Sequence, residues 1–225
     1  MHKVIVGVVV ILASASCARR QSLSGFAVST QGRSVAIVSL SVNDYEQSLQ
    51  GWNAMRTSPL MFSRAATMVR NVEQQFARHW RVIPAESFVG RPDYQALAGP
   101  PREVALPIFG DAYMRLFGAD RSDLIAARID PAKIKALAAI TGADLIAVIY
   151  AEWAVRTGGF VPTSKPLSKN VVSIFDSSGN SVYHGRLDST GDRTLGAYSK
   201  VVVDENSIDD WVSAFAAGIA ELLAR

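Results

Sequence analysis

The chain has 225 residues, of which 49% are hydrophobic and 19% charged, so one ordinary globular domain can bury its core without a disulfide or a metal ion. Its formal net charge is only +3 and its basic residues are scattered, which argues against the clustered basic face of a nucleic-acid-binding protein. A single cysteine excludes an internal disulfide framework.

The N-terminus has the three parts of a secretory signal. Lys3 gives a basic start, residues 4–12 (VIVGVVVIL) are apolar, and the small residues 13–16 (ASAS) lead to Cys17. The apolar stretch is shorter than the roughly 20 residues that a membrane-spanning helix needs. We therefore predict a signal peptide over residues 1–16.

Two processing routes are open after this signal. Residues 13–15 suit an ordinary signal peptidase, which would release a periplasmic protein. Residues 13–17 also resemble a lipobox, in which Cys17 is acylated and becomes the new N-terminus, although Ser14 stands where leucine is usual. We predict lipidation, because the only cysteine lies at the position that this pathway reads, and two or three acyl chains anchor a protein stably. By resemblance to proteobacterial lipoproteins, Ala18 favours sorting to the outer membrane.

A tether, a strand and a long helix are predicted next. Residues 17–33 are polar and lack periodicity, which predicts a flexible tether reaching about 20–25 Å; an edge strand near Phe26 is the alternative. Residues 34–42 are rich in β-branched side chains and predict a buried strand. An apolar stripe over residues 58–80 predicts a helix of about 20 residues, and residues 81–84 a short strand.

Residues 85–130 form a long excursion interrupted by glycine and proline. Phe109, Tyr113 and Phe117 belong to a stretch with helical spacing, so we expect one or two short helices. Because long irregular connections are uncommon in compact domains, we also expect a partner-docking surface that includes Tyr113 and Phe117.

The C-terminal half has the clearest signals. Residues 130–142 predict a helix that begins at Asp130-Pro131 and ends at Gly142, followed by an apolar strand over residues 145–155. Residues 157–169 read as a loop in which Phe160 and Val161 are candidate partner contacts. Two strands of a hairpin follow, at residues 170–175 and 181–187, and residues 198–203 are a candidate edge strand. A final amphipathic helix over residues 207–225 is expected to be capped by Ser207, with Asp210 in the capping-box position.

This order of elements predicts one α/β domain over residues 34–225, with a mixed sheet of about four to five strands flanked by helices. Catalytic signals are few: His79 ends a helix, His184 lies on a strand, and the common nucleotide, hydrolase and zinc motifs are absent. The sequence D-S-S-G-N at residues 176–180 predicts a turn rather than a calcium loop. We therefore predict no catalytic, cofactor-binding or metal-binding residue, and keep a hydrolase with two carboxylates as an alternative.

The helix that closes in Thr141-Gly142-Ala143-Asp144 before an apolar strand, the hairpin with the turn at Asp176 and the C-terminal helix resemble a group of bacterial envelope lipoproteins. The group includes the curli secretion lipoprotein CsgG and the peptidoglycan-synthase activator LpoB. The resemblance covers residues 34–224 and implies a fold similar to the TolB N-terminal domain and to anticodon-binding domains. It also implies non-catalytic work in secretion, synthase activation or assembly of envelope machines.

These features together predict a lipoprotein on the periplasmic face of the outer membrane that binds or helps assemble other envelope proteins. Its expected partners are the membrane, through the lipid on Cys17, and envelope proteins; a homo-oligomer is a further expectation, and nucleic acid is not expected. A secretion pore like CsgG is the alternative, although the chain lacks two pairs of strands with the alternating pattern of a membrane barrel.

Overall fold

A computed structural model describes residues 23–44, 57–97, 107–109, 112–113, 121–160, 163–197 and 203–225. The strands are β1 (Ser34–Asp44), β2 (Arg81–Ile83), β3 (Pro107–Phe109), β4 (Ala112–Tyr113), β5 (Leu145–Gly158), β6 (Thr163–Asp176), β7 (Ser181–Thr190) and β8 (Gly196–Ala197). The helices are α1 (Leu23–Ser29), α2 (Thr57–Phe76), the 3-10 turn η2 (Ala85–Ser87), α3 (Pro92–Leu97), α4 (Arg121–Ile125), α5 (Pro131–Thr141) and α6 (Ile208–Ala224). No helix among these residues has the length and hydropathy of a membrane span.

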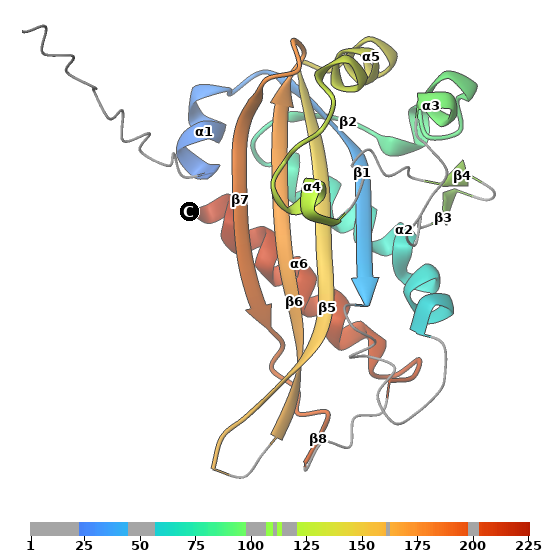
Figure 1. Cartoon of the computed structure of the whole chain (residues 1–225). Helices are drawn as coiled ribbons and strands as arrows, with labels where there is room; N and C mark the ends of the chain where they lie inside the picture. Colours follow the sequence, from blue (N-terminus) through green and yellow to red (C-terminus); the bar gives the residue numbers. More distant parts are fainter. Residues whose placement is uncertain are drawn as a thin grey trace, which may run out of the picture.

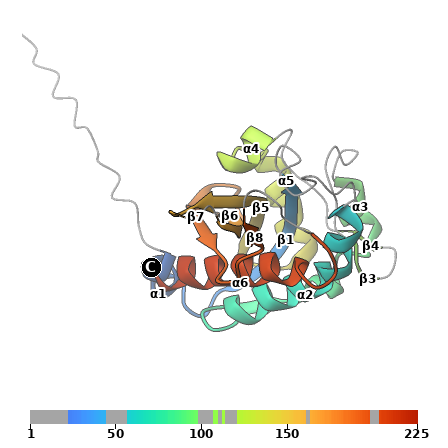
Figure 2. The same ribbon diagram turned by 90° about the horizontal axis from the view of Figure 1, so that it is seen from below.

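The main sheet has the strand order β2-β1-β5-β6-β7, with β8 added beside β6. Strands β2, β1 and β5 run parallel, whereas β5, β6 and β7 form an antiparallel meander. The helices α1, α2 and α6 cover one face of this sheet, and α4 lies on the other side (Figure 2). The prediction of a single α/β domain with a mixed sheet is therefore confirmed.

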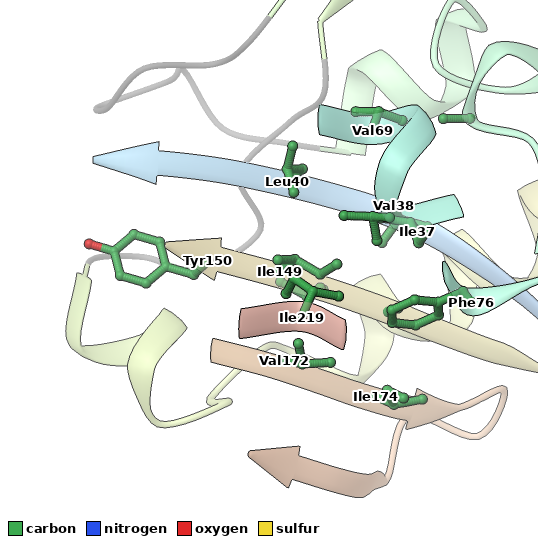
Figure 3. Packing of buried hydrophobic residues seen from close by; sticks show 14 of the residues in the cluster. Ile37, Val38, Leu40, Val69, Phe76, Ile149, Tyr150, Val172, Ile174 and Ile219 are labelled. Carbon is green, nitrogen blue, oxygen red and sulfur yellow. The ribbon is translucent and has the colours of Figure 1, made fainter. Parts of the chain in front are cut away.

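The core lies between the sheet and the helices α2 and α6. Strand residues such as Leu40, Ile149 and Val172 meet Phe76 of α2 and Ile219 of α6, and all five are at most 1% exposed (Figure 3). Alternate residues of a strand point to opposite faces, so each strand supplies every second side chain to this layer. The predicted apolar faces of the long and the C-terminal helices are thus buried as expected.

The junction between α5 and β5 explains the Gly142-Ala143-Asp144 sequence. Asp130 accepts a hydrogen bond from the Ala132 N–H (2.9 Å) at the start of α5, and Gly142 ends the helix with a φ of 67°. The Asp144 carboxylate then accepts hydrogen bonds from the Ser34 N–H (2.8 Å) and hydroxyl (2.7 Å). These bonds lower the pKa of Asp144 and join the starts of the neighbouring parallel strands β5 and β1.

The predicted tether is wrong over residues 23–33. Helix α1 forms there, and its Phe26 is only 5% exposed, with ring centroids 6.2 Å from Trp80 and 6.0 Å from Tyr183. The local sequence has no helical periodicity, and the helix is stabilised by contacts with these two distant aromatic rings. A pattern confined to residues 23–33 therefore could not predict it. Residues 17–22 of the predicted tether lie outside the described residues.

The loop predicted at residues 157–169 is also wrong, because β5 continues to Gly158 and β6 begins at Thr163. Burial alternates strictly from Thr163 to Asn170, which is the period of a strand. The sequence of these residues (TSKPLSKN) does not alternate between polar and apolar, and Pro166 argued against a strand; that proline lies beyond the last rung of β6 that pairs with β7.

Two further expectations need correction. Residues 107–109 and 112–113 pair as the antiparallel strands β3 and β4, with Phe109 opposite Ala112, in place of the predicted helical segment; the proline and glycine at positions 107 and 110 of the sequence disfavour a helix there. At the start of α6, Ser207 makes no side-chain cap. Asp204 instead accepts hydrogen bonds from the Ser207 N–H (2.8 Å) and the Asn206 N–H, while the Ser207 hydroxyl accepts one from the Asp204 N–H.

Candidate interaction site at the hairpin tip

The outer end of the β5–β6 hairpin extends past β1 and β7, and only the short strand β8 pairs with it, at Thr163 and Ser164 of β6. Pairing of β5 with β1 ends at Trp153, and pairing of β6 with β7 begins only at Leu167. Beyond these rungs β5 and β6 pair with each other as far as Gly158 and Thr163 (Figure 1). We call residues 154–160 and 163–166 the hairpin tip.

Local hydrogen bonds support this projecting end, since an isolated two-stranded ribbon is only marginally stable in water. The Leu195 N–H donates to the Ser164 carbonyl (2.8 Å) and the Gly191 N–H to the Pro166 carbonyl (2.9 Å), so the chain after β7 lies along β6. The Thr157 and Ser164 hydroxyls are 3.2 Å apart across the hairpin. These contacts tie the described strands of the hairpin tip to each other and to the chain after β7.

An exposed aromatic side chain, Phe160, follows the end of β5. Gly159 has a φ of 102°, a conformation that favours glycine, and it presents Phe160 to solvent with a relative exposure of 104%. Among the described residues, only Val28 (75%) is another exposed large hydrophobic side chain. Aromatic side chains are enriched at protein interfaces, so this exposed phenylalanine on a supported projection is a candidate contact residue.

Two cations share one rung of the hairpin, four residues before and five residues after this phenylalanine. Arg156 of β5 is opposite Lys165 of β6 in the antiparallel register. The side chain of Arg156 makes a 3.4 Å hydrogen bond to the Thr190 hydroxyl, and within the described part of the chain neither cation forms an ion pair. Hydrophobic and positively charged groups thus occupy the same projection.

The other acidic and basic groups are mostly engaged in structural contacts. Burial raises the pKa of the Asp176 carboxyl, but hydrogen bonds from Asn180 and Ser178 outweigh this effect and hold the pKa below its usual value. The same hydrogen bonds close the turn that was predicted at residues 176–180. The His184 ring contacts the Ser173 hydroxyl across β7 and β6 at 3.0 Å. Within the described ranges, no group of three histidine, cysteine, aspartate or glutamate side chains is placed to hold a metal ion.

A buried polar row crosses the sheet face opposite α6. The Tyr150 hydroxyl donates to the Glu152 carboxylate (3.0 Å), and both residues are at most 3% exposed. Ser41, opposite Tyr150 on β1, and Ser39 have buried hydroxyls without a hydrogen-bond partner among the described residues. Glu152 on β5 lies opposite Lys169 on β6, and Lys169 lies opposite Asp188 on β7.

Of the predicted contact residues, the structure places Phe160 at the hairpin tip. Tyr113 lies on β4, where the backbone alone is described, while Phe117, Val161 and the predicted lipidation residue Cys17 lie outside the described residues. The prediction missed Arg156 and Lys165. Residues 163–170 (TSKPLSKN) do not alternate between polar and apolar side chains, so no local signal placed Lys165 on a strand paired with β5.

Comparison with known proteins gives no family for this chain. No protein-family model matches it, and no curated protein matches it. A solved structure of lipoprotein GNA1162 from Neisseria meningitidis is similar at 14% identity, with a TM-score of 0.35, over 84% of this chain and 99% of that one. The hypothetical protein CT253 from Chlamydia trachomatis is similar at 15% identity, with a TM-score of 0.37, over 87% of this chain and 95% of that one. At TM-scores below 0.5, neither likeness supports a conclusion about fold or function.

Proposed function

We propose that this chain is a non-catalytic lipoprotein, anchored through Cys17 to the periplasmic face of the outer membrane, that binds or helps assemble other envelope proteins. The observation that carries the binding half of this proposal is Phe160, fully exposed at the hairpin tip. Burial of a phenylalanine side chain contributes roughly 2–3 kcal/mol. The strands that carry this phenylalanine are already hydrogen-bonded, so ordering them on binding costs little conformational entropy.

The position of α1 supports an anchor at the opposite end of the sheet. Six residues lead from Cys17 to Leu23, where α1 begins, and they span at most about 21 Å. Phe26 of α1 packs against Tyr183, which pairs with Ile174 of β6. From Ile174 to Thr163, β6 runs about 36 Å toward the hairpin tip (Figure 1). A lipid on Cys17 would therefore hold the α1 end near the membrane and leave the tip free for a partner.

The engaged polar groups are consistent with a non-catalytic protein. Asp144 and Asp176 accept hydrogen bonds from backbone N–H groups of their own junction and turn. Carboxylates used in this way stabilise local structure, and the hydrogen bonds that lower their pKa values make them poorer proton donors and acceptors near neutral pH.

Two measurements test the two halves of the proposal. For the anchor, the Cys17→Ser protein is expected in the soluble periplasmic fraction, whereas the unaltered protein sediments with the outer membrane; equal membrane retention would refute the anchor. For binding, the intact protein is cross-linked in its own envelope and purified, and quantitative mass spectrometry is expected to find the same envelope proteins in repeated preparations. Recovery of the chain alone would refute the binding function.

A further inference from the structure

The two neighbouring cations of the hairpin tip, Arg156 and Lys165, indicate the charge of the partner. Like charges directly opposite each other in an antiparallel pair are destabilising. Arg156 and Lys165 occupy such a rung, and no carboxylate of the described residues lies within ion-pair distance of either. An external group with negative charge would relieve this repulsion.

The spacing along the strand defines how these groups meet a surface. Phe160 lies four residues beyond Arg156 and past the end of β5, so their Cα atoms are at most about 14 Å apart. A pocket that receives the phenylalanine would therefore meet the two cations at its rim. Charged groups at a rim accelerate association and reject partners of the wrong sign, while a buried aromatic residue supplies most of the affinity.

We propose that the partner bound by the hairpin tip is a protein with an apolar pocket bordered by carboxylates. In this complex Phe160 fills the pocket, and Arg156 and Lys165 form ion pairs with the acidic rim. The inference rests on the proposed function, because it names the chemistry of the surface that the same tip recognises.

Phosphate groups of a lipid bilayer would satisfy the same two cations, but the geometry favours a protein. The tip and α1 lie at opposite ends of the sheet, about 36 Å apart along β6. If Cys17 carries the proposed lipid, the six residues from Cys17 to α1 would keep the α1 end, not the tip, near the anchoring membrane. The partner is thus expected on a surface that the bilayer holding Cys17 does not provide.

The test uses a photo-reactive phenylalanine analogue at position 160 of the intact protein in its own envelope. We expect a cross-linked protein whose attachment site lies among apolar residues flanked by aspartate or glutamate. The double variant Arg156→Glu with Lys165→Glu is expected to reduce the yield roughly tenfold or more. The control Arg78→Glu with Lys135→Glu changes the net charge equally at exposed residues far from the tip, and it is expected to retain the yield.

Reversing the charge of the partner's rim completes the test. Replacing its flanking acidic residues with lysine is expected to restore cross-linking to the Arg156→Glu, Lys165→Glu variant. A phospholipid adduct, or a yield that the double variant leaves unchanged, would overturn the proposal. If Phe160→Ser abolishes binding while the charge variant does not, the proposed function stands and the acidic rim is wrong; if Phe160→Ser has no effect, the tip is not the binding site.

Discussion

Replacing Asp144 tests how the α5–β5 junction holds the two parallel strands together. In the Asp144→Ala variant the Ser34 N–H loses its acceptor at 2.8 Å, and Ser34 is 0% exposed. A buried donor without a partner costs about 1–3 kcal/mol. Because the carboxylate itself is exposed to solvent, we expect a loss near 2 kcal/mol, which lowers the melting temperature by roughly 4–8 °C in a domain of this size.

Asp144→Asn separates the charge from the hydrogen bond, since its amide oxygen still accepts from Ser34. Hydrogen bonds from Ser34 lower the pKa of Asp144 in the folded protein, so the contribution of the charge is complete above about pH 4 and is lost as the pH falls through the folded-state pKa. Urea unfolding of the wild type and of both variants is measured between pH 2 and pH 7. The stability difference between the wild type and Asp144→Asn should shrink toward zero at the acid end. A difference that is constant with pH, or an alanine variant within about 0.5 kcal/mol of the wild type at pH 7, would refute the reasoning.

Two further changes test the packing of the α1, α2 and α6 layer. Phe26→Ala should destabilise the protein by about 3 kcal/mol in urea unfolding, because the ring is 5% exposed between Trp80 and Tyr183. Its control Val28→Ala, at a side chain that is 75% exposed, should change the stability by less than about 0.5 kcal/mol; equal values would mean that α1 is not docked. Gly218→Ala should cost about 1–2 kcal/mol, because its new Cβ would lie 2.0 Å from the Asn170 side-chain nitrogen. The shorter side chain of Asn170→Ser should recover part of that loss, and strictly additive effects would contradict the contact.

Local sequence signals predicted the elements that depend on local physics. The capped helix from Pro131 to Gly142 and the turn at Asp176 formed as expected, because capping and turn residues act on their immediate neighbours. The mixed sheet followed from the order of these elements. Helix α1 could not be predicted in this way, since Phe26 is stabilised by rings more than fifty residues away.

The sequence predicted Phe160 of the candidate site but not Arg156 and Lys165, because the position of these cations depends on strand pairing. Phe160 stood out because an apolar residue among glycines and prolines is conspicuous in a sequence. The pairing of Arg156 with Lys165 depends on the register of two strands, and residue 166, a proline, made the second strand resemble a loop. The charge of the hairpin tip therefore became visible only once the strands were paired.

Comparison of Phe160→Ser with Val28→Ser is the most direct test of the central claim that the hairpin tip binds envelope proteins. Both variants replace an exposed hydrophobic residue by serine, at opposite ends of the sheet, so their folding stability should remain that of the wild type. Each intact protein is purified from cross-linked envelopes, and co-purified proteins are quantified by mass spectrometry. The proposal predicts that Phe160→Ser loses the partners that Val28→Ser keeps. Equal recovery of the same partners by both variants would contradict it.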